Sequence, residues 1–212
     1  MKPILAWHFC AIDNGKPVLR NGKPAKRVGE TERYRGELKM CASGLHASEK
    51  IMDALKYAPG PYLRWVACSG KMEQGDDKLV CSVRRIVAEI DATMLLHEFA
   101  CRCAERALAR IKKPDPRSVA AIVAKRAWMR GEITDADLDA SWDVALDASL
   151  DVAWAAARAA AWAVALDVAW AVAWDVAWAA ARDEARDVAR AAEREWQEQE
   201  LTRIVSEAMG LE

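Results

Sequence analysis

The stretch AWDVAWAAARDEARDV, Ala173–Val188, repeats its residue types every four positions. Alanine opens each group of four, Trp or Arg follows, Asp or Ala comes third, and Val or Ala usually comes fourth. The same pattern runs from Ser141 to Ala192 with few exceptions. Because alanine is the best helix former, the repeat predicts a long helical region.

No residue in this region marks a helix end. The chain has no Gly between Gly131 and Gly210 and no Pro after Pro116, and these are the residues that most often stop a helix. As one piece, residues 135–208 would form a helix about 110 Å long at about 1.5 Å per residue. A helical hairpin is the alternative, although no residue marks its turn.

The repeat also predicts which sides of the helix are apolar. Successive helical residues lie about 100° apart, so the second and fourth positions of each tetrad face opposite sides. One partner helix could not cover both, and we therefore expect a homo-oligomer. Its interface is expected where the tetrads are least charged, at Trp162, Trp170, Trp174 and Trp178. Packing against the two preceding helices is one alternative, and a recent tandem duplication with little selected purpose is another.

Residues 1–90 have the pattern of a small β-rich domain. The runs ILAWHFCAI and YLRWVACSG are strand-like and bounded by Gly, Pro and Asn. Asn-Gly pairs at Asn14 and Asn21 predict hairpin turns. The run SEKIMDALKYAPG predicts a helix capped by Ser48 and ended by a Pro-Gly pair. The run GDDKLVCSVRRIVAEID predicts a turn, a strand and the opening of the next helix.

The apolar residues after Asp91 follow a helical period instead. One helix is expected after Asp91 as its cap, a second from about Arg117 to Met129, and a third after the cap Thr134. The sequence thus predicts an α+β protein. It would comprise a β-rich head at 1–90, connecting helices at 91–131, and a helical oligomerisation region, a stalk or bundle, at 132–212.

The charge of the chain favours no partner class. The formal net charge is −1, so no overall field attracts nucleic acid or a membrane surface. The run Lys16–Arg27 holds five basic residues and no acid; it predicts a solvated loop, with phosphate or nucleic-acid binding as the alternative. The apolar run Ala153–Trp174 contains Arg158 and Asp167, each costing about 2.5–3.5 kcal/mol at a bilayer centre, which argues against a membrane span.

The thiol and imidazole groups predict no metal or catalytic site. The six cysteines lack a repeated spacing and no signal peptide precedes them, so we expect reduced thiols and a cytoplasmic protein. His97 and Cys101 have a two-ligand zinc spacing, but nothing nearby supplies a second pair, and core packing is favoured. Asp76 and Asp77 predict an exposed acidic turn. We therefore expect no metal, no cofactor and no catalytic residue.

Several motifs of the chain resemble those of a known family. The runs LAWHF, GLHASEKIMDALKYAPG, GDDKLV and EFACRCAERAL, followed by an Ala/Trp/Arg tandem tail, are similar to an uncharacterised family of phage and prophage proteins with a domain of unknown function. The similarity covers about residues 4–110, and the tail by composition only. It implies a phage or bacterial origin, and hence the host bacterial cytosol, without implying an activity.

A second resemblance, to ADP-ribosyltransferases, concerns the order of a few residues. A His on an early strand, the GLHAS segment Gly44–Ser48, a helix ending in Tyr57, and a further strand follow one another as in that fold. The resemblance implies that His8 holds a nicotinamide ribose and that Tyr57 stacks on the nicotinamide. The full set of ligand-binding residues that it implies is His8, Gly44, His46, Ser48 and Tyr57.

The same resemblance lacks a catalytic glutamate. The strand that should begin with it offers Arg84 and Arg85, and Glu89 comes too late. The resemblance therefore implies nucleotide binding rather than group transfer.

Three functions of different classes are expected from the sequence. The leading one is a non-enzymatic, oligomeric phage or prophage protein that binds a host protein or a small ligand, with counter-defence suggested by the phage resemblance alone. The second is a nucleotide-binding or ADP-ribosyltransferase-like head, in which His46 and Tyr57 would line one pocket. The third is a nucleic-acid-binding protein that uses Lys16–Arg27.

Overall fold

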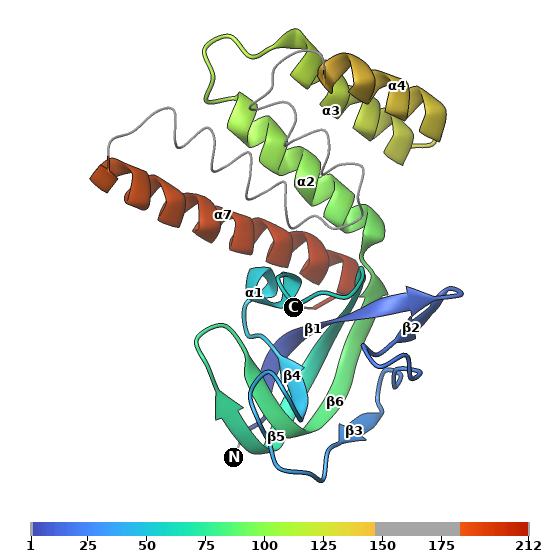
Figure 1. Cartoon of the computed structure of the whole chain (residues 1–212), viewed down its shortest axis with the longest axis vertical. Coiled ribbons are helices and arrows are strands. Elements are labelled where there is room, and N and C mark those ends of the chain that lie inside the picture. Colours follow the sequence, from blue (N-terminus) through green and yellow to red (C-terminus); the bar gives the residue numbers. More distant parts are fainter. Residues whose placement is uncertain (1, 147–182, 212) are drawn as a thin grey trace. The chain divides into compact units, whose positions relative to one another are not determined.

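The computed structural model describes residues 2–146 and 183–211. They belong to two compact units (Figure 1): a first unit of residues 1–93 with 201–212, and a second unit of residues 94–200. The units are described in turn, and the fold as a whole is of the expected α+β class.

The first unit is built on a curved antiparallel sheet that forms a half-barrel (Figure 1). The strand order is β2-β1-β5-β6-β3, and β4 also pairs with β6. The strands predicted at ILAWHFCAI and YLRWVACSG are confirmed as β1 and β5, which are neighbours. The strands are β1 (Ile4–Asp13), β2 (Lys16–Val18), β3 (Thr31–Arg33), β4 (Leu45–Ala47), β5 (Tyr62–Gln74) and β6 (Leu79–Asp91).

The turn between β1 and β2 follows from its two residues. Asn14 and Gly15 both have positive φ, 48° and 72°, and Asp13 pairs with Lys16 directly across the turn. Two consecutive left-handed residues are what a two-residue hairpin of the primed type requires. The hairpin predicted from this Asn-Gly pair is confirmed.

The short helix α1 (Ile51–Leu55) forms where the sequence predicts it, but its start differs. The N-cap is Lys50, without a side-chain hydrogen bond. Ser48 is instead paired with Trp7 of β1 through both its backbone groups, at 2.7 and 3.0 Å. The prediction that Ser48 caps this helix is therefore wrong, because its backbone is held by a strand forty residues earlier in the chain.

One face of the sheet carries a buried apolar cluster, while Trp7, Phe9 and Leu63 are buried on the other face. Because strand residues alternate between faces, the small residues of neighbouring strands meet on the same side. The buried cluster consists of Ala6, Ala47, Val66, Cys68, Leu79 and Cys81. The polar residues described in the next subsection continue this face along β1, β5 and β6.

The second unit is helical. The helices among its described residues are α2 (Thr93–Leu108), α3 (Pro116–Met129), α4 (Asp135–Leu146) and the part of α7 (Asp183–Met209) that precedes residue 201. The predicted start of α2 is confirmed, since Asp91 Oδ1 accepts a hydrogen bond from the backbone N–H of Thr93 at 3.0 Å.

Arginine–glutamate pairs join the helices of the second unit. Arg126 of α3 bonds Glu98 and Glu105 of α2, at 2.6 and 2.7 Å. Arg106 of α2 pairs with Glu193 of α7 at 3.0 Å. These contacts place α3 and α7 directly against α2.

The two described parts of the tetrad region do not lie on one straight helix. Leu138 of α4 packs against Ala121 of α3, and Glu193 of α7 contacts α2. A straight helix would separate Leu138 from Glu193 by about 80 Å, whereas α2 and α3 are each no longer than about 24 Å. Of the two alternatives that the sequence left open, one straight helix of about 110 Å does not fit the contacts of these described parts.

Several expectations concern residues that the structure does not describe. The interface predicted at Trp162, Trp170, Trp174 and Trp178 falls outside the described residues, as does the apolar run Ala153–Trp174. Within residues 2–146 and 183–211, no helix is long and apolar enough to cross a membrane.

Replacing Thr134 with alanine should lower the free energy of unfolding by about 1 kcal/mol. Asp137 N–H donates to Thr134 Oγ1 at 3.2 Å, and Thr134 N–H donates to Asp137 Oδ2 at 3.0 Å, so the expected cap of α4 is present and reciprocal. Urea denaturation measures the loss. Thr134→Ser keeps the hydroxyl and should behave as the wild type; an equal loss in both variants would contradict the capping role.

Candidate functional site

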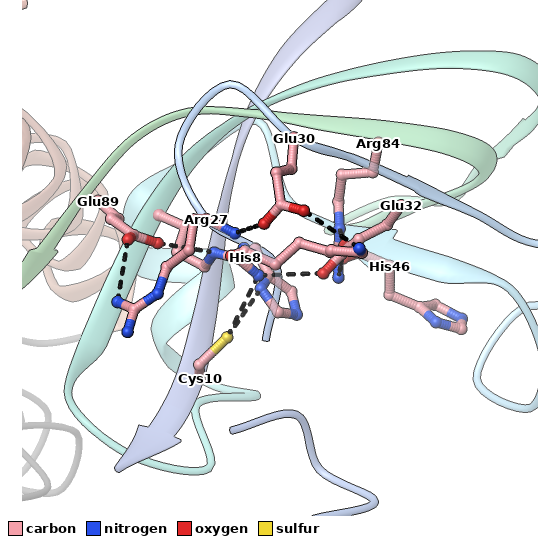
Figure 2. A network of polar contacts seen from close by, with 10 residues as sticks. His8, Cys10, Arg27, Glu30, Glu32, His46, Arg84 and Glu89 are labelled. Carbon is pink, nitrogen blue, oxygen red and sulfur yellow. Dashed lines mark hydrogen bonds and ion pairs between the residues drawn. The ribbon is translucent and has the colours of Figure 1, made fainter. Parts of the chain in front are cut away.

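The register of three strands places a row of polar side chains on one face of the sheet. His8 on β1 pairs with Arg64 on β5, and Arg64 pairs with Glu89 on β6. Directly paired residues of neighbouring strands have their side chains on the same face. Figure 2 shows the resulting network, with Glu89 at one end, His46 at the other and His8 between them.

Two buried arginines share one buried carboxylate at the centre of this network. Arg64, Arg84 and Glu32 are 0%, 2% and 7% exposed. Arg64 Nη1 donates to Glu32 Oε1 at 3.2 Å, and Arg84 Nε donates to Glu32 Oε2 at 2.7 Å. Backbone carbonyls take two further guanidinium N–H groups: Lys26 accepts from Arg64, and His46 accepts from Arg84. The pairing of β3 with β6, which sets Glu32 opposite Arg84, creates this arrangement.

Glu89 is a second carboxylate beside Arg64. Its Oε2 lies 3.6 Å from Arg64 Nε, and its Oε1 lies 3.7 Å from Arg27 Nη1. Burial and then the Glu89 carboxylate raise the pKa of Tyr62 above its usual value. The Glu89 carboxylate therefore lies beside two guanidinium groups at this end of the network.

His8 is a half-buried imidazole that stays neutral. Burial holds its pKa well below the usual range, and the positive charges of Arg84 and Arg64 lower it further. The Cys10 thiol lies 3.6 Å from His8 Nδ1, but burial raises the pKa of Cys10. The pair is therefore neutral imidazole and thiol, rather than the thiolate that a cysteine nucleophile requires.

His46 also lies near positively charged side chains. Burial lowers its pKa, and so do the charges of Lys78 and Arg84. Its Nε2 accepts a hydrogen bond from the backbone N–H of Cys41 at 3.1 Å. Arg20 and Arg84 are among the charges that lower the pKa of both His8 and His46. The two imidazoles thus share a region of positive potential.

Tyr57 lies at the exposed rim of the same region. Its hydroxyl donates to Asp77 Oδ2 at 2.7 Å, and Lys78 Nζ lies 3.8 Å from the centre of its ring. Arg20 Nη2 donates to the backbone carbonyl of Tyr57 at 2.9 Å. Lys78 therefore lies near both rings. Its ammonium group contacts the Tyr57 ring, and its charge lowers the pKa of His46.

The five ligand-binding residues predicted from the sequence divide into two groups. His8, His46 and Tyr57 surround the cationic region described above. Gly44 has a structural reason to be glycine: its φ is 115°, and a Cβ there would lie 2.3 Å from a methyl carbon of Val80. Ser48 is buried and held by its backbone pairing with β1.

Other expected candidates are accounted for by contacts within their own unit. In the basic run Lys16–Arg27, Lys26 pairs with Glu30 at 3.1 Å, while Arg20 and Arg27 make the contacts given above. In the second unit, His97 is buried with its ring edge-on to Trp128, at 5.3 Å between centres. Among the described residues, no group of three His, Cys, Asp or Glu side chains could hold a metal ion.

Sequence reasoning missed the charged centre of the site. Glu32, Arg64 and Arg84 were not among the candidates, although Arg64 interrupts the apolar run YLRWVA at an inward-facing strand position. A charged residue at such a position is the signal that could have revealed it, since buried charges are almost always paired.

One known protein family is similar to part of the chain. The family model of a domain of unknown function (DUF7666) matches residues 20–98. The matched segment includes Arg20, Glu32, His46, Arg64, Lys78, Arg84 and Glu89, whereas His8 and Cys10 precede it. No curated protein and no solved structure matches the chain significantly.

Proposed function

We propose that the first unit binds a small phosphate-bearing anion, with nucleotides as the first class to test, beside His8 and His46. The supporting observation is the cationic region around these two half-buried rings, to which Arg20, Lys78, Arg84 and Arg64 contribute. The positive potential that disfavours protonation of the two histidines also favours the binding of an anion at the same place.

The neutral histidines suit this role as hydrogen-bonding groups. When the Cys10 thiol donates to Nδ1 of His8, the ring proton is on Nε2 and can be donated to an anionic oxygen. Arg20 is exposed, and Lys78 is half-buried at the rim, so both can supply charge to a bound phosphate at little cost in desolvation. Tyr57, at 40% exposure, offers an aromatic surface next to these cations.

The proposal is one of binding rather than catalysis. It is compatible with the leading expectation of a small-ligand-binding protein and with the nucleotide-binding alternative. Assembly into an oligomer, a phage origin and a host partner stay predictions from the sequence.

Replacing Arg20 with alanine should weaken phosphate or nucleotide binding by about ten- to one-hundred-fold, because one charge-assisted hydrogen bond is worth about 1.5–3 kcal/mol. Calorimetric titration of the full chain with inorganic phosphate, AMP and ADP at two salt concentrations measures this. Affinity should fall as salt rises.

Arg33→Ala is the matched control. Arg33 is also exposed, but it follows Glu32 on β3 and its side chain lies on the opposite face. Equal effects of the two substitutions, or no binding of any of the three ligands to the wild type, would refute the proposed function.

A further inference from the structure

Two buried polar atoms of the network have no hydrogen-bond partner in the described part of the chain. They are Arg64 Nε, a donor, and Glu89 Oε2, an acceptor. They face each other at 3.6 Å, which is too far for a direct hydrogen bond. Buried polar atoms are nearly always satisfied, so this pair points to a group that binds between them.

The pair sets the chemistry of that group. An oxygen about 2.8 Å from both atoms would accept from Arg64 N–H and donate to the Glu89 carboxylate. A hydroxyl can do both at once, whereas an ether or phosphate oxygen cannot donate and an ammonium cannot accept. The position therefore fits the hydroxyl group of a ligand.

The position also lies at a definite distance from the imidazole of His8. Glu89 and His8 are on β6 and β1, which flank β5 in the sheet, so their strands are about 10 Å apart. This separation is comparable with the length of a phosphorylated five-carbon sugar. Arg27, the other partner of Glu89, has a side chain 57% exposed and can move outward to admit a ligand.

We infer that Arg64 and Glu89 form a hydroxyl-recognition subsite, and that the ligand of the first unit is a phosphorylated sugar, free or as part of a nucleotide. This inference rests on the proposed function. The phosphate of the ligand would bind beside His8, and a sugar hydroxyl of the same ligand would bind between Arg64 and Glu89.

The test compares two ligands that differ only in hydroxyl groups. Ribose 5-phosphate and tetrahydrofurfuryl phosphate share a ring and a phosphate, but the second has no hydroxyl. The wild-type chain should bind ribose 5-phosphate about ten-fold more tightly by calorimetry. In Glu89→Met, which has no acceptor at this position, the two ligands should bind equally. Glu73→Met, at an exposed position of β5, is the control and should keep the ten-fold preference.

The outcomes separate the inference from the proposed function. Equal binding of both ligands by the wild type, or a preference that persists in Glu89→Met, would overturn the subsite and leave phosphate binding intact. Failure of the wild type to bind inorganic phosphate and both esters would overturn the two together. Glu89→Met should still bind inorganic phosphate, and this retained binding excludes loss of fold as the cause.

Discussion

Replacing Glu32 with glutamine should lower the free energy of unfolding of the first unit by about 3–5 kcal/mol. Glu32 is the carboxylate shared by Arg64 and Arg84. Its removal leaves two buried guanidinium groups facing a neutral amide, and the desolvation cost of those charges is then no longer offset. A loss of this size is a large part of the total stability of a small domain. Urea denaturation followed by circular dichroism measures it.

Glu30→Gln is the matched control two residues away. Glu30 pairs with Lys26 at 3.1 Å, and both side chains are about half exposed. Exposed ion pairs contribute roughly 0–1 kcal/mol, so this variant should unfold almost as the wild type does. A similar small loss for Glu32→Gln would mean that Arg64 and Arg84 are not held by this carboxylate.

Local residue chemistry was sufficient to predict one hairpin turn and one helix cap of this fold. Asn14 and Gly15 make their hairpin, and Thr134 with Asp137 makes the reciprocal cap, because the groups involved lie within a few residues of each other. Ser48 shows the limit of such reasoning. Its sequence context favours a helix cap, but pairing with Trp7, distant in sequence, holds its backbone in the sheet instead.

The site was only half predictable for the same reason. His8, His46 and Tyr57 were candidates only through the resemblance to ADP-ribosyltransferases, and their role in ligand binding stays a prediction. Glu32 could not, because its role depends on β3 pairing with β6 across a long connection. The tetrad repeat has a similar limit: its pattern predicts helix, but contacts such as that of Glu193 with Arg106 decide where the helices lie.

Acidification from pH 7 to pH 4 should destabilise the second unit by about 3 kcal/mol through His97 alone. Burial, and then the charge of Lys125, lower the pKa of His97 to about 4. In the unfolded chain its pKa is about 6.5. The pKa of Lys125 itself is lowered to about 8, so Lys125 keeps its charge throughout this range.

The direction of the effect follows from the two pKa values of His97. Below pH 6.5 the unfolded chain takes up a proton that the folded chain does not, so stability present above pH 6.5 is lost as the pH falls towards 4. The loss should be about 2 kcal/mol at pH 5 and about 3 kcal/mol at pH 4. His8, whose pKa is also held low, contributes in the same direction but in the first unit.

His97→Gln isolates the contribution because it removes the titrating ring. Urea denaturation at pH 7, 5 and 4 should show the wild type losing about 3 kcal/mol more than this variant between the extremes. His46→Gln is the control; its ring is half-buried in the first unit, so it should leave the loss in the second unit unchanged. If His97→Gln lost as much stability on acidification as the wild type, His97 would have to be charged in the folded protein. The buried position of His97 against Trp128 and beside Lys125 would then be incorrect.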